Sequence, residues 1–162
     1  MKKTTTSIAI LLLLAGTFFS CNNEKEEYFD EPIDVPFTVF SKSDMSNLKE
    51  ALLGTSCGWG WMPWPPPPQE IIIINSVEEL QNILRCSDEN DFPIIDFSKY
   101  TLLFARGAFR GIVIRSIGLQ QLSSRTYKMS VVVALSSVPA HWHAVIITEK
   151  LDKNARVKLN VT

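Results

Sequence analysis

The pattern of apolar residues predicts two strands in the first half of the chain, one from alternation and one from a continuous apolar run. In PFTVFSKS, residues 36–43, Phe37 and Val39 fall on one side of an extended backbone. Four consecutive isoleucines, residues 71–74, are flanked by prolines on one side and by Asn75 on the other. Because such a β-branched run has no polar face, we expect this second strand to be buried on both sides.

Two segments have the spacing of helices. In SVEELQNILR, residues 76–85, Ser76 is placed to cap the helix. Glu79, three residues later, is placed to accept a hydrogen bond from the backbone at the cap in return. Its apolar stripe consists of Val77, Leu80, Ile83 and Leu84. A shorter helix is predicted over residues 44–54, where Asp44 opens the pattern and Gly54 ends it.

The second half of the chain is a series of strand patterns. They cover residues 100–106, 111–120, 126–136, 144–150 and 156–161. The links between them are too short for helical crossovers, which predicts an antiparallel meander. The expected fold class is therefore α+β: a mainly antiparallel sheet, with a meander in the C-terminal half, covered by one or two helices.

This order of elements resembles the PrcB-like family of protease-complex subunits. The likeness covers roughly residues 71–162 and rests on a capped helix, INSVEELQNIL, then the strand entry Asp96-Phe97-Ser98, then strands beginning RGIVIRSIGLQ and YKMSVVVAL. Many small surface lipoproteins of gut anaerobes look similar. The resemblance implies an accessory or binding domain rather than an enzyme.

The N-terminus has the pattern of an export signal. Two lysines precede the apolar run Ile8–Ala15, which is too short to span a bilayer. Ser20 followed by Cys21 resembles a lipobox, in which the cysteine is acylated and becomes the mature N-terminus. The alternative is ordinary cleavage nearby, with Cys21 left as a thiol. We predict a signal peptide over residues 1–20 and lipidation at Cys21, which would anchor the protein in a membrane.

The acidic segment after Cys21 is expected to be a solvated tether over residues 21–35, because it lacks a periodic apolar face. A single globular domain, residues 36–162, would follow. Within the tether, Lys25-Glu26-Glu27 resembles a signal that sends lipoproteins of some Gram-negative bacteria to the cell surface. The predicted location is the outer membrane, exposed at the cell surface, with a periplasm-facing orientation as the alternative.

Composition excludes some classes of partner. Of 162 residues, 46% are apolar and 20% are charged, which is typical of one globular domain. Removal of residues 1–20 takes away two lysines and no acid, so the formal net charge changes from −1 to −3. This balance offers no basic face for nucleic acid, and no oligomeric state is indicated.

Cys57 and Cys86 are the remaining thiols if Cys21 is acylated. An even pair in an exported protein favours a disulfide, although two separate thiols, one of them buried, are the alternative. Such a bridge would fix one end of the segment CGWGWMPWPPPP, residues 57–68, which holds three tryptophans and five prolines. Its prolines exclude a helix or a central strand.

The three indoles of this segment suggest a binding function. Trp59, Trp61 and Trp64 would form either a recognition platform for a protein partner or a sugar, or a lid over an open part of the sheet. The platform hypothesis makes the protein a non-enzymatic binding or accessory module. The alternatives are a glycan-binding module of a nutrient-uptake system and, third, a small extracellular hydrolase.

Other chemistry has weak support. His141 and His143 would point to the same side of a strand, with Trp142 facing the core, but no Cys, Asp or Glu lies within four residues to complete a metal site. No Gly-x-Ser-x-Gly elbow accompanies them. The acids of SDENDF, residues 87–92, look like a solvated turn. We therefore predict no cofactor, no metal and no catalytic residue.

Overall fold

The computed structural model describes residues 26–43, 56–59 and 69–162. Within these ranges, only the backbone is described for residues 42–43, 108–112 and 135–140. The strands are β1 Tyr28–Asp34, β2 Phe37–Ser43, β3 Cys57–Trp59, β4 Glu70–Ile74, β5 Leu84–Cys86, β6 Tyr100–Ser123, β7 Thr126–Glu149 and β8 Arg156–Val161. The helices in these ranges are α1 Val77–Ile83 and the short 3-10 helix η1 Glu89–Asp91. The helix predicted over residues 44–54 lies outside the described residues.

The prediction of an α+β fold is wrong, because the described part of the chain is nearly all sheet. Its one α-helix spans Val77–Ile83, and the residues that follow it, predicted to continue the helix, form strand β5 instead. Pairing of β5 with β3 competes with the helix for Leu84 and Arg85. Local helical spacing therefore yields to a long-range strand pair at this point.

The predicted meander is also wrong, because two of the expected turns, at residues 107–110 and 137–143, lie inside continuous strands. Strands β6 and β7 each contain 24 residues and form one long antiparallel hairpin, with its turn at residues 124–125. The patterns at residues 100–106 and 111–120 both belong to β6. Where a turn was expected, the register only shifts, between Arg110 and Ile112 and again between Ile114 and Ser116.

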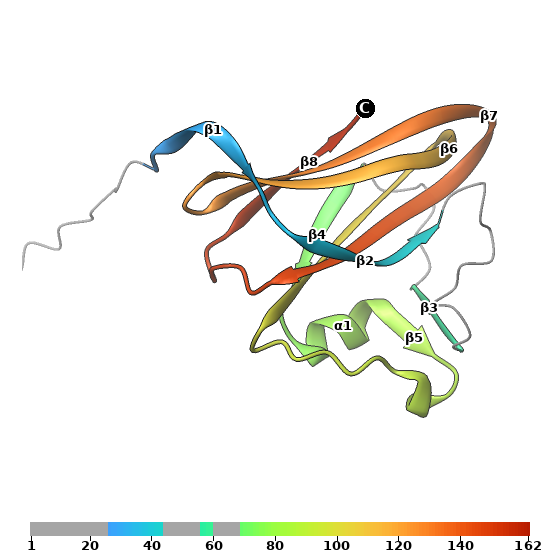
Figure 1. The fold of residues 1–162 in the computed structure, drawn as a ribbon. Helices are drawn as coiled ribbons and strands as arrows, with labels where there is room; N and C mark the ends of the chain where they lie inside the picture. The colour runs from blue at the N-terminus through green and yellow to red at the C-terminus, as the bar shows by residue number, and fades with distance from the viewer. Residues whose placement is uncertain (1–25, 44–55, 60–68) are drawn as a thin grey trace, which may run out of the picture.

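The hairpin is folded back on itself (Figure 1). Strand β8 is parallel to β7 and pairs with its first residues, beginning with Arg156 beside Thr126. Only residues 150–155 connect the end of β7 to that point, and the seven residue steps from Glu149 to Arg156 reach at most about 25 Å. A straight 24-residue strand would be roughly 80 Å long. The two ends of β7 must therefore lie close together, which requires the bend near the register shifts.

The same bend explains how the other strands join the sheet. The strand order is β1-β6-β7-β2, with β4 on β6 and β8 on β7. Strands β1 and β2 are joined by Val35-Pro36 alone, yet they pair with the outer edges of β6 and β7, respectively. The chain can make this crossing in two residues only because the folded hairpin brings these two edges together.

Two apolar clusters stabilise the folded hairpin. The first lies between its halves and includes Leu103, Leu119, Met129, Trp142 and Ile146. The second lies on the other side of the sheet, under α1 and the β3–β5 pair, and includes Ile74, Leu80, Leu84, Leu102, Phe104 and Val145. Alternate isoleucines of β4 enter the two clusters, which confirms that this strand has two apolar faces.

The cap of α1 is confirmed, but its apolar stripe is shorter than predicted. The Ser76 hydroxyl accepts a bond from the backbone N–H of Glu79, and the Glu79 carboxylate accepts one from the backbone N–H of Asn75. Leu80 is fully buried, whereas Val77 is 47% exposed.

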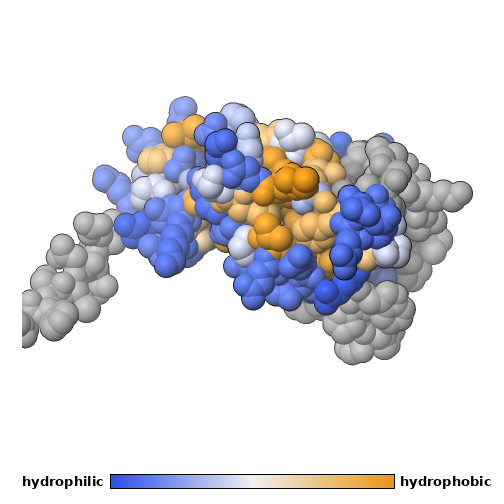
Figure 2. Space-filling view, turned by 90° about the horizontal axis from the view of Figure 1, so that it is seen from below, coloured by the Kyte–Doolittle hydropathy of each residue, from blue (hydrophilic) through white to orange (hydrophobic). Residues whose placement is uncertain are grey.

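Viewed from the side of α1 (Figure 2), apolar surface gathers near the centre of the domain among hydrophilic side chains.

The predicted tether is corrected at its C-terminal end. Residues 28–34, expected to be solvated linker, form strand β1 against β6. All seven residues of β1 are exposed, since the strand lies at an edge and a register irregularity separates Tyr28 from Ile33. This exposure explains why the apolar pattern gave no sign of a strand. The folded part of the chain thus begins well before residue 36.

Candidate functional site

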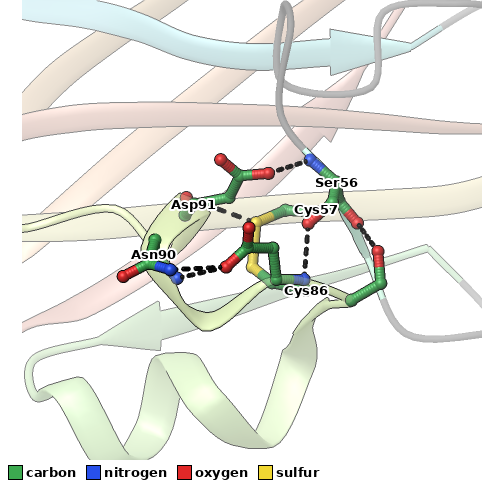
Figure 3. The surroundings of a disulfide bond; sticks show 7 residues. Ser56, Cys57, Cys86, Asn90 and Asp91 are labelled. Carbon is green, nitrogen blue, oxygen red and sulfur yellow. Dashed lines mark hydrogen bonds between the residues drawn. A yellow bond between two sulfur atoms is a disulfide. The ribbon is translucent and has the colours of Figure 1, made fainter.

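The Cys57–Cys86 disulfide predicted from the sequence is present, and it joins β3 to β5. Figure 3 shows that the acidic turn after β5 packs around it. The Asp91 carboxylate accepts a 2.6 Å hydrogen bond from the backbone N–H of Ser56, and the Ser56 hydroxyl accepts one from Asp88 N–H at 2.8 Å. The bond from Ser56 lowers the pKa of Asp91. This turn, predicted to be only solvated, fixes the entry to β3.

Trp59 acts as a lid on the second apolar cluster. Its ring is stacked on Phe104 with 4.7 Å between centroids, and Phe40 meets it edge-on at 6.3 Å. The indole Nε1 donates to the Ser41 hydroxyl at 3.3 Å. For Trp59, therefore, the contacts favour the lid over the platform, while Trp61 and Trp64 lie outside the described residues.

A partly buried histidine completes the contacts of Trp59. His143 Nε2 lies 3.2 Å from the Ser41 hydroxyl, and the imidazole is tilted against both Trp59 and Phe104. Burial lowers the pKa of His143 from 6.5 to about 4, so the ring is neutral at physiological pH. Neutral Nε2 can then accept from the Ser41 hydroxyl, which itself accepts from Trp59.

The Ser41–His143 pair is a serine and a histidine at hydrogen-bond distance, a pairing that sequence reasoning missed because 102 residues separate them. Its surroundings favour a structural role. Ser41 is only 8% exposed, so its hydroxyl has little access to a substrate. A histidine with a pKa of about 4 is also a weak general base at neutral pH. We assign the pair to the support of Trp59.

The far end of the tryptophan-rich segment is held by an ion pair. Arg106 Nε lies 2.5 Å from the Glu70 carboxylate, and the guanidinium lies over the Phe104 ring at 5.6 Å. Phe104 and Arg106 are two apart on β6, so they share one face of the sheet. Trp59 and Glu70, which flank residues 60–68, are thus both fixed to that face. We call Trp59, Ser41, His143, Phe104, Arg106 and Glu70 the loop base.

The two histidines of HWH are placed differently. His141 is exposed, whereas His143 is part of the loop base, and Trp142 between them points into the first cluster as predicted. Trp142 is 1% exposed, and its indole N–H has no partner among the described residues. Within the described ranges, no three His, Cys, Asp or Glu side chains come together as a metal site would require.

Comparisons with protein-family models, curated proteins and solved structures gave no match. The resemblance to the PrcB-like family therefore stays a prediction.

Among the described residues, no helix is long and apolar enough to span a membrane. Cys21 and Lys25 lie outside the described residues, whereas Glu26 lies at the start of them and is treated below.

Proposed function

We propose that this protein is a non-enzymatic, lipid-anchored binding or accessory module that presents residues 60–68 to a partner. The observation that supports this function most directly is the loop base. The described residues on either side of the segment are fixed to one face of β6, Trp59 through Phe104 and Glu70 through Arg106. The disulfide lies only two residues before Trp59 and adds a covalent restraint.

Such a base is suited to recognition because it limits the conformations of the segment before a partner binds. Binding costs less conformational entropy when a loop is held at both ends. The held segment contains Trp61, Trp64 and a run of prolines, and proline restricts the backbone further. Tryptophan is the side chain most enriched among residues that dominate binding energy. Trp59 supports the segment, which leaves Trp61 and Trp64 as the proposed contact residues.

The proposed location is the outer membrane at the cell surface, with Cys21 as the lipid attachment site. The lipobox-like Ser20-Cys21 and the Lys25-Glu26-Glu27 signal support this location. The proposed partner is another protein of the envelope, in keeping with the resemblance to an accessory subunit. A glycan remains the alternative ligand, because indole rings stack on sugars as well as on aromatic side chains.

Site-specific photocrosslinking in the native membrane tests this function. A photoreactive amino acid at position 64 should yield a discrete adduct, and the same group at Val132, an exposed position on β7, should not. Trp61→Ala should reduce the adduct at position 64 without changing the melting temperature. Equal adducts at both positions, or none at position 64, would contradict a protein-binding role for this segment.

Tryptophan fluorescence separates the glycan alternative from a protein partner. The chain has four tryptophans, and Trp59 and Trp142 are packed in the fold. Changes caused by an added oligosaccharide should therefore come from Trp61 and Trp64, and should vanish in Trp61→Phe/Trp64→Phe. A saturable change that follows this pattern favours the glycan-binding module. No change, together with a discrete protein adduct, favours the accessory module.

A further inference from the structure

The first described residue of the chain, Glu26, is held firmly at the turn of the long hairpin. Its carboxylate accepts hydrogen bonds from the hydroxyls of Ser123 and Thr126, the latter at 2.9 Å. Arg156 lies 3.7 Å from its second oxygen. Chiefly because of the two hydroxyl donors, the pKa of Glu26 is lowered, so the clamp is ionised at neutral pH. We call these four residues the Glu26 clamp.

The clamp lies on a surface with basic side chains. Lys128 and Lys158 are register partners on β7 and β8, and Arg156 is two residues before Lys158. Alternation places these three on the outer face, because Tyr127, Met129, Val157 and Leu159 between them pack in the first cluster. The Lys158 ammonium lies 5.7 Å from the centre of the Tyr28 ring, which is 54% exposed. We call Tyr28, Lys128, Arg156 and Lys158 the turn-end face.

The clamp sharply limits the distance between the domain and a lipid on Cys21. Four residues lie between Cys21 and Glu26, and a fully extended chain over these five residue steps spans at most about 18 Å. The tether expected from the sequence, ending at residue 35, would have reached roughly 50 Å. The structured domain therefore cannot move far from the membrane that holds the anchor.

We propose that the turn-end face lies against the phosphate-bearing headgroups of that membrane, oriented there by the Glu26 clamp. This inference rests on the proposed lipid anchor. The short chain between Cys21 and Glu26 brings this face to the bilayer. Its side chains Lys128 and Lys158 complement lipid phosphates, while Arg156 is partnered by Glu26. A tyrosine among them suits the interface, where aromatic rings with a polar edge are enriched. Glu27, Asp30 and Glu31 are also exposed in this part of the chain, so the short link contributes more than net charge does.

The orientation bears directly on the loop base. In Figure 1 the start of β1 lies at the left end of the domain and β3, with Trp59 at its end, lies at the right. A domain attached through the Glu26 clamp would hold the loop base away from the bilayer. Residues 60–68 would then begin and end on the side that a partner in solution, or in a neighbouring envelope protein, can reach.

Energy transfer to labelled lipids tests the orientation. The full mature protein, purified with its lipid, would be reconstituted in vesicles of phosphatidylethanolamine and phosphatidylglycerol with an acceptor on the headgroup. A bio-orthogonal donor dye would replace Ser124, exposed in the hairpin turn, or Gln81, exposed on α1. We expect several-fold higher transfer from position 124 than from position 81. Equal transfer from both positions in membrane-bound protein would overturn the proposal.

Two matched variants test the role of the clamp. Glu26→Gln weakens the clamp, and Glu27→Gln makes the same chemical change at the next residue, which is exposed. Both alter the Lys25-Glu26-Glu27 segment equally, but only Glu26→Gln should lower transfer from position 124. An equal loss in both variants would overturn the assignment to the clamp.

Failure of the anchor itself gives a different result. If Cys21→Ala stays with membranes that have been stripped of peripheral proteins, or if the wild-type protein does not stay with them, the lipid anchor in the proposed function is wrong. Membrane association that depends on Cys21, combined with equal transfer at positions 124 and 81, rejects only the orientation.

Discussion

The two ends of the folded hairpin are stabilised by different physical interactions. At the loop base, a stacked Trp59–Phe104 pair, a neutral His143 and a nearby disulfide make most of the contacts. At the turn end, the ionised carboxylate of Glu26 accepts hydrogen bonds from two hydroxyls and pairs with an arginine. Apolar and covalent restraints are insensitive to salt, whereas a partly solvated ionic clamp is screened by it. The part of the loop base around Trp59 should thus stay fixed under conditions that release the turn end.

Removal of Trp59 should produce the largest loss at the loop base. Trp59→Ala removes the ring stacked on Phe104 and leaves the Ser41 hydroxyl without its indole donor. We expect a loss of about 3–5 kcal/mol in the free energy of unfolding, measured by chemical denaturation. Trp61→Ala is the control and should change stability little if that residue serves binding. Equal, large losses in both variants would mean that both indoles are lids.

Loss of the disulfide should have the next largest effect. The bridged cysteines are 29 residues apart, and a loop of this length corresponds to about 3–4 kcal/mol of stabilisation in the chain-entropy description. Cys57→Ser/Cys86→Ser should therefore unfold at lower denaturant concentration while the turn end keeps its hydrogen-exchange protection. The bridge itself is checked by mass spectrometry of unreduced, alkylated protein. Labelling of both thiols there would exclude it.

The partly buried His143 makes the loop base sensitive to acid. His143 has a pKa of about 4 in the fold against an ordinary value of 6.5, so between these values the unfolded chain binds more protons than the folded one. Stability should be level above pH 6.5 and fall as the pH drops from 6.5 towards 4, by up to about 3 kcal/mol. His143→Gln should flatten this dependence. His141→Gln, at the exposed neighbour, should leave it unchanged.

Strand and turn patterns predicted local structure better than topology. The cap at Ser76, the doubly packed isoleucines of β4 and the strand at Arg156–Val161 all follow from short-range patterns, and the structure contains them. The continuous β6 and the parallel β8 do not follow from such patterns. A glycine such as Gly107 predicts a turn locally, and only its contact with Trp142 reveals why a glycine is needed inside a strand.

The candidate site was predictable only in part. An even pair of cysteines in a chain expected to be exported was enough to favour the Cys57–Cys86 bridge, which the structure contains. Nothing in the sequence joins Ser41 to His143, or Glu26 to Ser123, since these pairs depend on strand pairings between distant segments. Glu26 illustrates the limit well. In the sequence it is one acid among several, and its clamp exists only because β1 places it beside the hairpin turn.

Close packing at Gly107 offers a smaller test near the loop base. A Cβ atom added there would lie 2.9 Å from Trp142 Nε1 and 3.1 Å from a Gln69 carbon, whereas one added at Gly118 meets nothing within 4 Å. Both glycines belong to β6, so Gly118→Ala is a matched control. We expect Gly107→Ala to cost about 1–3 kcal/mol and Gly118→Ala to be neutral or slightly stabilising, as read by thermal unfolding. Equal effects would show that the side chain of Trp142 moves freely aside.

The smallest effect should come from the turn end, and it should depend on pH in a defined direction. The pKa of Glu26 is lowered below its ordinary value of 4.5, first by the hydroxyls of Ser123 and Thr126 and less by Arg156. Its ionised form therefore stabilises the fold above pH 4.5, and this contribution is lost as the pH falls through the lowered value. Glu26→Gln should melt slightly earlier than the wild-type protein at pH 7 and at the same temperature in strong acid, while Glu27→Gln should match the wild type at both. Because the clamp is partly solvated, added salt should also narrow the difference at pH 7.

The loop base should not respond to the substitution of Glu26. Hydrogen exchange at Ser41 and His143 and fluorescence quenching of Trp59 should therefore be the same in Glu26→Gln and Glu27→Gln. A loss of protection at the loop base in Glu26→Gln would show that the two ends are coupled through the hairpin rather than independently stabilised.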